Sequence, residues 1–185
     1  RLIPTPRDPD GRKVLYDKVL ADVPCSSDGT LRKTPGVLDR WSTATGASLH
    51  ALQASIAVRA AQLVKPGGTL VYSTCSLNPV EDEAVVAELL RADPSLKVIE
   101  DPRAPQLVRR PGLTTWKVLD EDNDDLVEYA SPTDVPESKT RRFRSSIFPP
   151  TDARIKAQLP RCMRFLPHDN ESGGFFVCVL RKEGS

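Results

Sequence analysis

Two cysteines and one aspartate stand where they could form a covalent catalytic site. Asp22 and Cys25 are separated only by Val23 and Pro24, and Cys75 lies in the run Ser-Thr-Cys-Ser. A cysteine thiolate is the strongest side-chain nucleophile near neutral pH, and a proline beside a cysteine stiffens its backbone. The three residues together predict covalent catalysis on an electron-poor substrate. Each cysteine taken alone fits equally well a small side chain packed in the core.

The segments before the two cysteines predict β-strands. Residues 14–21 (VLYDKVLA) and 69–73 (TLVYS) are short apolar runs, and we expect the first to be buried on both faces near its end. Residues 48–64 repeat apolar side chains at helical spacing, and the run Lys-Pro-Gly-Gly ends that pattern. Cys25 and Cys75 thus follow the carboxyl ends of two strands, where ligands bind in open α/β sheets. We expect both thiols at one rim of the sheet.

A second helix is predicted after the second cysteine. Asn78 can cap it, Pro79 suits the first helical position, and Glu81 can reach back to the cap. We therefore expect the helix to begin at Pro79, after the cap residue Asn78, and to end near Ala92.

The remaining apolar runs complete the predicted sheet. Residues 96–99 and 174–181 each predict a strand, whereas residues 26–47 are rich in Ser, Thr and Gly and are expected to be mostly loop. The order strand, helix, strand, helix, strand and late strand predicts an α/β domain with a mostly parallel sheet.

Composition limits the partners more than it identifies them. The chain has 185 residues, enough for one domain, and its formal net charge of +1 means that any nucleic-acid footprint must be local. No apolar run approaches the length that spans a bilayer, so we expect no membrane partner. The four cysteines contain no C-x-x-C pair, which predicts no metal site. We expect Cys162 and Cys178 to be structural.

Longer motifs connect these residues to a known family. DVPCSSDGT at 22–30 and YSTCSLNPVEDEAVV at 72–86 resemble two signature motifs of the Nop/Sun family of RNA cytosine-5 methyltransferases. RFLPHDNESGGFF at 164–176 resembles the C-terminal motif of that family. WKV at 116–118 and IFPP at 147–150 resemble the branch that modifies tRNA. The resemblance implies a Rossmann-like S-adenosylmethionine-dependent methyltransferase fold, of which this chain would hold the C-terminal half of the sheet.

The resemblance also implies a role for each residue of the site. Cys75 would attack carbon 6 of cytosine, which makes carbon 5 nucleophilic enough to accept a methyl group. Cys25 would assist removal of the carbon 5 proton and so release the product. Asp22 would lie between the base and the cofactor S-adenosyl-L-methionine, and Pro24 would join it at the cofactor. The base must leave its stack to reach such a site.

The chain departs from the family pattern in two respects. Ser27 stands where the family usually has glycine, which matters only if the backbone there needs a positive φ. The family's glycine-rich cofactor loop, acidic ribose-binding residue and catalytic lysine do not occur in this sequence. We therefore expect that the isolated chain neither holds the cofactor well nor turns over, and that strand 14–21 has an exposed edge. The first residue is Arg1 and the only methionine is Met163, so we expect a longer protein.

Two basic clusters are candidates for contact with RNA. Arg32 and Lys33 follow the first motif and fit equally phosphate binding or a solvated loop. The denser cluster consists of Arg141, Arg142 and Arg144. Phe143 stands among these arginines and is expected to stack on a base. The resemblance makes tRNA the expected RNA partner.

The sequence predicts four segments. Residues 1–13 form a loop or linker, residues 14–100 the catalytic core with both cysteine motifs, residues 101–160 an irregular insertion, and residues 161–185 the C-terminal motif and last strand. The acidic stretch at 121–125 is expected to be a solvated loop, because it lacks a calcium-loop pattern.

Two other functions remain open. A non-catalytic RNA-binding or assembly module could keep the same fold, although retention of both cysteines and Asp22 favours the enzyme. A DNA cytosine-5 methyltransferase would use a Pro-Cys thiol such as Cys25 as its nucleophile, and the Thr-Cys motif at Cys75 argues against it. The tRNA-modifying branch implies residence in the nucleus, including the nucleolus, and also in the cytoplasm.

Overall fold

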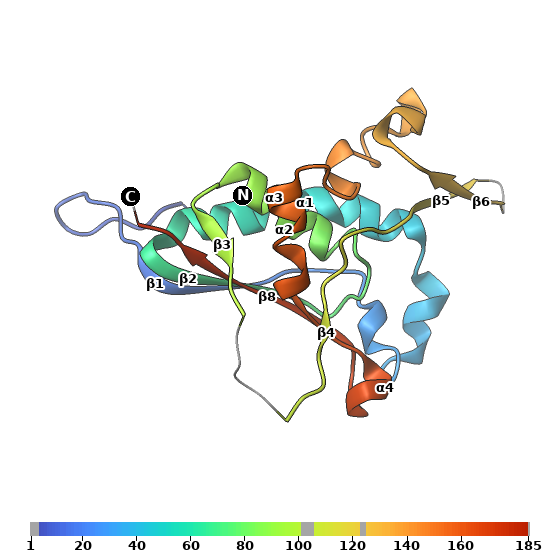
Figure 1. Ribbon diagram of the computed structural model, residues 1–185, viewed down its shortest axis with the longest axis horizontal. Helices are drawn as coiled ribbons and strands as arrows, with labels where there is room; N and C mark the ends of the chain where they lie inside the picture. The colour runs from blue at the N-terminus through green and yellow to red at the C-terminus, as the bar shows by residue number, and fades with distance from the viewer. Residues whose placement is uncertain (1–3, 101–105, 123–124, 185) are drawn as a thin grey trace.

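The computed structural model describes residues 4–100, 106–122 and 125–184, which form a mixed sheet with the two longest helices on one face (Figure 1). The strand order is β1-β2-β8-β7-β4, and β3 pairs with another part of β8. The bounds are Tyr16–Asp22 for β1, Val64–Thr74 for β2, Leu96–Val98 for β3, Arg110–Pro111 for β4, Met163–Phe165 for β7 and Phe175–Lys182 for β8. These bounds confirm the predicted strands near 14–21, 69–73, 96–99 and 174–181 to within a few residues, except that β2 starts five residues earlier.

The sheet contains one parallel pairing among the described residues, between β1 and β2. The other pairings, β2 with β8, β3 with β8, β7 with β8 and β4 with β7, are antiparallel. The expectation of a mostly parallel sheet is therefore wrong for this part of the chain. The reason is that β8 runs in reverse between β2 and β3, which themselves share one direction because both oppose β8.

Strand β1 lies at the end of the sheet and pairs only with β2 among the described residues. Ala21 is buried beneath the helices, whereas Leu20, on the opposite face, is 68% exposed. The prediction that this strand is buried on both faces near its end is wrong at Leu20. The exposed edge agrees with the expectation drawn from the sequence.

Helix α1 spans Thr43–Leu63 and begins five residues before the predicted start. Its first turns are ordered by close packing, because a Cβ at Gly46 would collide with the side chain of Asn78. Residues 26–47 were expected to be mostly loop, but two 3-10 helices, Asp28–Thr30 and Pro35–Arg40, also occur there. The serine, threonine and glycine residues of this segment therefore belong to short helical turns and to a close helix contact, as well as to loops.

Helix α2 spans Glu83–Ala92 and begins four residues after the predicted start at Pro79. Residues 79–82 form turns, and the Asn78 side chain accepts a hydrogen bond from the backbone N–H of Val80 at 3.1 Å. The predicted capping by Glu81 is wrong, because that carboxylate turns into the protein towards Ser26 and Ser76.

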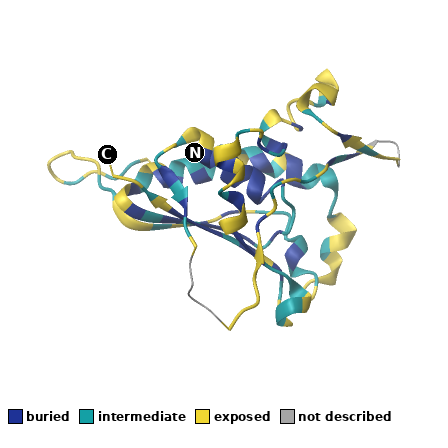
Figure 2. Ribbon diagram, viewed as in Figure 1, coloured by how far each residue is buried: buried dark blue, intermediate teal, exposed yellow. Residues whose placement is uncertain are grey.

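The core has two parts, which Figure 2 shows as buried stretches of the sheet and of the helices above it. The larger part lies between the sheet and helices α1 and α2, and Tyr72 and Phe176 meet there edge to face at 6.3 Å. The smaller part joins Ala47 and Val80 to side chains from residues 116–148, among them Tyr129 and Phe143, whose rings meet edge to face at 5.4 Å.

The region predicted as an irregular insertion contains short elements. Strands β5 (Val118–Asp122) and β6 (Asp125–Tyr129) form a separate hairpin, and short helices follow, including α3 at Ala153–Lys156. Helix α4, Pro167–Asn170, lies in the C-terminal motif. Parts of the predicted linker (1–3), insertion (101–105) and acidic stretch (123–124) lie outside the described residues. The four-segment division stays a prediction.

Candidate active site

The parallel pairing of β1 and β2 brings the two cysteine motifs together. Asp22 is paired with Ser73 in the register, so the chain leaves both strands at the same level of the sheet. The thiol sulfurs of Cys25 and Cys75 consequently lie 3.2 Å apart, and both side chains are half-buried. The structure thus unites at one rim two residues that lie far apart in the sequence.

The three motifs that resemble those of the Nop/Sun family, at 22–30, 72–86 and 164–176, meet at Gly29. Its backbone N–H donates to the Cys75 carbonyl at 3.0 Å, and its carbonyl accepts from the backbone N–H of Gly174 at 2.6 Å. A Cβ at Gly29 would lie 2.7 Å from the carbonyl oxygens of both partners, so only glycine fits there without a shift. The backbone after Cys25 is therefore fixed by the other two motifs.

The two thiols differ in their surroundings. Burial, and then the hydrogen bond to Cys75, raise the pKa of Cys25 to about 12. Cys25 is therefore a protonated thiol at neutral pH, able to donate its S–H to the neighbouring sulfur.

Ser27 occupies a left-handed backbone conformation, with φ of 62°. This is the condition under which serine in place of glycine carries a cost, since a Cβ is disfavoured there. Its hydroxyl lies 3.5 Å from the Cys75 sulfur and 3.9 Å from the Cys25 sulfur. The departure from the family pattern therefore adds a polar group beside both thiols.

Asp22 and Pro24 are exposed at the carboxyl end of β1. The Asp22 carboxylate accepts a hydrogen bond from the Ser73 hydroxyl at 2.8 Å, which leaves its other oxygen available to a ligand. The carbonyl of Pro24 already accepts a hydrogen bond from the side chain of Gln53 at 2.9 Å. Both residues lie beside the thiols, and their roles towards a cofactor remain predictions.

A group of buried charges supports the rim, and the sequence did not identify it as part of the site. Glu81, Asp82 and Glu83 are consecutive carboxylates with no exposed surface. Arg164 binds Glu83 with two nitrogens and also donates to the Leu77 carbonyl at 2.8 Å. The sequence signal for this group was three adjacent acidic residues at the start of an apolar run. Side chains of consecutive residues point in different directions, so at least one of the three must face the protein interior.

Asp82 holds its carboxyl group in surroundings that disfavour a negative charge. Burial raises its pKa well above the usual range, although Arg164 at 3.5 Å acts in the opposite direction. One carboxylate oxygen accepts a hydrogen bond from the Thr74 hydroxyl at 2.7 Å, so Asp82 is tied to the residue before Cys75.

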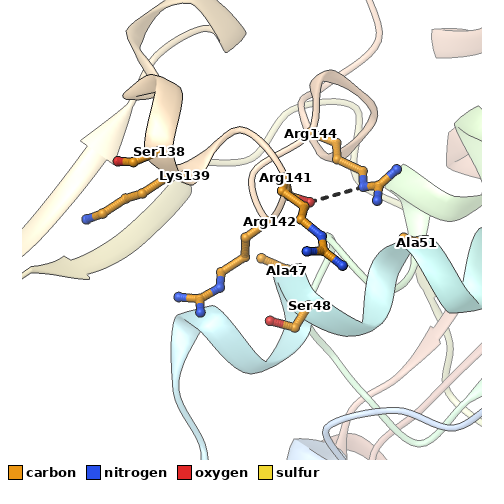
Figure 3. A pocket seen from close by; sticks show the side chains of 8 residues that line it. All are labelled: Ala47, Ser48, Ala51, Ser138, Lys139, Arg141, Arg142 and Arg144. Carbon is orange, nitrogen blue, oxygen red and sulfur yellow. Dashed lines mark hydrogen bonds between the residues drawn. The ribbon is translucent and has the colours of Figure 1, made fainter.

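The predicted arginine cluster lines a hollow of about 480 Å³ beside α1, which we call the arginine hollow (Figure 3). Its lining residues are Ala47, Ser48, Ala51, Ser138, Lys139, Arg141, Arg142 and Arg144. Figure 3 shows the three arginine side chains extending alongside α1 from one short segment. Among the described residues, Arg141 and Arg142 have no side-chain ion pair, which leaves their charges available to a ligand.

Phe143 does not take the role expected from the sequence. It is 2% exposed and packs against Tyr129, so the prediction that it stacks on a base is wrong. Its ring anchors the segment that presents the arginines on either side. Phe143 is therefore a core residue, although its sequence neighbours are exposed arginines.

The other predicted basic pair lies apart from the arginine hollow. Arg32 and Lys33 belong to the loop after the first motif, and Arg32 donates to the Pro167 carbonyl at 3.3 Å in the C-terminal motif. Neither residue lines the arginine hollow. The structure therefore does not unite the two basic clusters.

The remaining cysteines are buried in the core. The hydrogen bond of the Cys162 thiol to Cys178, and then burial, raise the pKa of Cys162 well above its usual value. Across residues 4–100, 106–122 and 125–184, no group of three metal-binding side chains is found. No helix in this described part is both long and apolar enough to cross a membrane.

Similarity to known proteins agrees with the motifs. Residues 5–181 match the family model "16S rRNA methyltransferase RsmB/F". The chain is 44% identical over 179 residues to the tRNA (cytosine(34)-C(5))-methyltransferase of Drosophila melanogaster, covering 94% of this chain and 24% of that protein. It is 45% identical over 174 residues to the multisite-specific tRNA:(cytosine-C(5))-methyltransferase trm4b of Schizosaccharomyces pombe, covering 92% and 25%. The chain thus spans about a quarter of the length of these relatives.

Solved structures share the fold. A methyltransferase homolog protein from Pyrococcus horikoshii superposes with a TM-score of 0.54 at 25% identity, covering 91% of this chain and 40% of that one. NSun6 from Pyrococcus horikoshii with SFG superposes with a TM-score of 0.60 at 22% identity, covering 93% and 31%. The prediction of a Rossmann-like methyltransferase fold is confirmed.

Proposed function

Because this chain belongs to the RsmB/F methyltransferase family, we propose that it carries the covalent chemistry of RNA cytosine-5 methylation, with tRNA as the substrate. The observation that carries the proposal is the contact of the Cys25 and Cys75 sulfurs, 3.2 Å apart at the carboxyl ends of two parallel strands. The names of the two tRNA-modifying relatives support the choice of tRNA.

Cys75 begins the reaction. Its thiolate forms a bond to carbon 6 of an unstacked cytosine, and the electrons of the 5,6 double bond move into the ring and make carbon 5 nucleophilic. Carbon 5 then takes the methyl group, which S-adenosylmethionine supplies when bound. Loss of the carbon 5 proton restores the double bond and expels the Cys75 thiolate, so the nucleophile is regenerated.

Cys25 takes the carbon 5 proton. Its thiol is protonated at the outset, partly because of the neighbouring Cys75 sulfur. Once that sulfur is bonded to carbon, it no longer carries a negative charge or accepts the Cys25 proton as strongly. The change favours ionisation of Cys25, whose own proton passes to solvent water, at the stage where a base is needed.

S-adenosylmethionine fits this chain along one edge only. The free oxygen of the exposed Asp22 carboxylate, beside Pro24, can accept a hydrogen bond from the cofactor. The isolated 185-residue chain is therefore expected to bind the cofactor weakly and not to turn over, and micromolar binding in calorimetry would contradict this.

The arginine hollow contacts the RNA backbone. Guanidinium groups bind phosphates through paired N–H donors, and Arg141, Arg142 and Arg144 are exposed together on one surface. A second, adjoining hollow shares Ala51 and Arg144 and continues along α1 to Gln62. A strand of RNA lying along α1 would thus meet several donors in succession. Arg32 and Lys33 are proposed as a separate contact.

The decisive experiment is to trap the covalent adduct between RNA and the full-length protein. With S-adenosylmethionine and tRNA bearing 5-fluorocytosine, the carbon 5 fluorine cannot leave as a proton does, so the adduct persists through denaturation. We expect the adduct in the wild type and its loss in Cys75→Ala. Loss only in Cys25→Ala would exchange the two roles. Absence of an adduct with tRNA and with rRNA would favour the non-catalytic RNA-binding module.

We also propose that the protein resides in the nucleus, including the nucleolus, with a cytoplasmic fraction. Localisation of the tagged protein by fluorescence microscopy tests this, and exclusion from the nucleus would contradict it.

A further inference from the structure

Glu81 is a buried carboxylate that accepts four hydrogen bonds. One oxygen accepts from the backbone N–H of Ser26 at 2.8 Å and from the side-chain amide of Gln53 at 3.0 Å. The other accepts from the hydroxyl of Ser26 at 2.5 Å and from the hydroxyl of Ser76 at 3.1 Å. All four donors are neutral, and the nearby cation Arg164 pairs instead with Asp82 and Glu83.

The donors to Glu81 are the immediate neighbours of the two thiols. Ser26 follows Cys25 in the chain, and Ser76 follows Cys75. Gln53 adds a further contact, because its side-chain amide also donates to the carbonyl of Pro24, the residue before Cys25. A single side chain therefore binds both cysteine loops from beneath.

We propose that Glu81 is a positioning residue that clamps the two cysteine loops, so that the sulfurs of Cys25 and Cys75 stay in contact. The proposal rests on the proposed function for its catalytic meaning, because the clamp serves a reaction in which one thiol follows the other. Strand pairing ends at Asp22 and Ser73, so the loops beyond need another link. Glu81 provides such a link, in addition to the Gly29 contact and to the hydrogen bond that the Asp28 carboxylate accepts from the backbone N–H of Leu77 at 2.8 Å.

The clamp depends on geometry, and glutamine can reproduce it. In Glu81→Gln, the new amide carbonyl can accept from the Ser26 N–H and the Gln53 amide, while the new NH₂ donates to the Ser26 and Ser76 hydroxyls, which rotate to accept. Alanine removes all four bonds and leaves buried donors without partners. The pair Glu81→Ala and Glu81→Gln therefore separates the clamp from any role of the negative charge.

The test measures how readily the two thiols form a disulfide in a glutathione buffer. Two protein thiols and one oxidised glutathione give one protein disulfide and two reduced glutathione molecules, so the equilibrium constant reports the effective concentration of Cys25 towards Cys75. Mass spectrometry locates the bond. The reaction needs neither RNA nor cofactor.

Glu81→Ala is expected to lower this equilibrium constant by at least about tenfold, because sub-ångström placement of the thiols is lost. Glu81→Gln is expected to stay within a few-fold of the wild type. Asp120→Ala is the matched control, since Asp120 is also a buried carboxylate, bound to Lys139 and Tyr129 in the smaller core. It is expected to destabilise the protein without changing the thiol equilibrium.

Three results overturn the clamp: an unchanged constant in Glu81→Ala, an equal fall in Asp120→Ala, or an equal fall in Glu81→Gln. Should Glu81→Ala fail to fold, Ser76→Ala and Ser26→Ala remove single bonds, and a constant unchanged in both also overturns it. The adduct experiment is then repeated with Glu81→Ala, whose rate is expected to fall while Glu81→Gln recovers it. A wild type without any adduct would contradict the proposed function and leave the thiol result standing.

Discussion

The cysteine loops rest on buried carboxylates, whereas the arginine hollow rests on a hydrophobic cluster. Glu81, Asp82 and Glu83 are fully buried beneath the two thiols, and the first two bind the cysteine loops through hydrogen bonds. The arginines stand on a short segment anchored by Phe143 and Ile147, which are buried in the smaller core. The first region is fixed by directional bonds and the second by packing.

This difference fits what each region has to do. Directional bonds fix the place of an atom to within a fraction of an ångström, which covalent chemistry at carbon 6 and carbon 5 requires. Non-directional packing holds a segment in place but leaves exposed side chains free to adjust to a phosphate backbone. Mutations in the two regions should therefore act on different measurements.

The largest effect is expected at Arg164, the cation of the buried carboxylate group. Arg164→Met leaves Glu83 and Asp82 buried without a positive partner, which should lower the free energy of unfolding by about 3–5 kcal/mol. Urea denaturation measures it. Arg110→Met is the control, because Arg110 forms a comparable two-bond ion pair with Asp169 at the surface. A loss in Arg164→Met no larger than in the control would mean that the carboxylate group does not hold this region.

The second effect is expected in RNA binding and not in stability. Replacing Arg141, Arg142 and Arg144 with serine should weaken tRNA binding by roughly tenfold or more and reduce the salt dependence of the affinity. Filter binding across a series of salt concentrations measures both. Arg154→Ser is the control, since Arg154 is an exposed arginine on α3 paired with Asp152. Unchanged affinity and salt dependence in the triple variant would remove the hollow from the RNA surface.

A third effect concerns His50, which joins the two regions. Its Nδ1 donates to the Val80 carbonyl at 2.7 Å, and its Nε2 accepts from the Ser146 hydroxyl at 2.9 Å. Burial lowers the pKa of His50 below its usual 6.5, so the folded state holds the neutral ring while the unfolded chain takes up a proton. Stability is then complete above pH 6.5 and falls as the pH drops below it, by at most about 1.4 kcal/mol per pH unit.

Denaturation between about pH 8 and pH 5 tests this, a range that spans the usual pKa of histidine. His50→Gln should be less stable at the upper end but should lose the part of the slope that lies below pH 6.5. His168→Gln is the control, because His168 is the other histidine of the chain and is exposed. A slope that persists in His50→Gln, or disappears in His168→Gln, would contradict the assignment.

The sequence predicted the strands and the two thiols better than it predicted their support. Apolar runs and strand ends are local signals, so Cys25 and Cys75 could be assigned to one rim before the structure was known. The fate of Glu81 and Phe143 depended on residues far along the chain. Glu81 fitted a helix cap by spacing, and Phe143 fitted a stacking role by its neighbours, but Ser26 and Tyr129 respectively determine where they point.

The smallest effect is expected at Ser27, and it tests how tightly the cysteine loops are held. Serine at φ of 62° carries the cost of a left-handed conformation, about 1–2 kcal/mol. Glycine removes that cost but gains freedom in the unfolded chain, so Ser27→Gly should stabilise the protein by about 0.5–1 kcal/mol. Ser27→Ala keeps the strained backbone and loses the hydroxyl beside the two sulfurs, so it should be no more stable than the wild type. Urea denaturation of all three separates the outcomes. If Ser27→Gly is less stable than Ser27→Ala, the loop is free to relax its backbone, and the rigidity attributed to the buried carboxylates does not extend past Ser26.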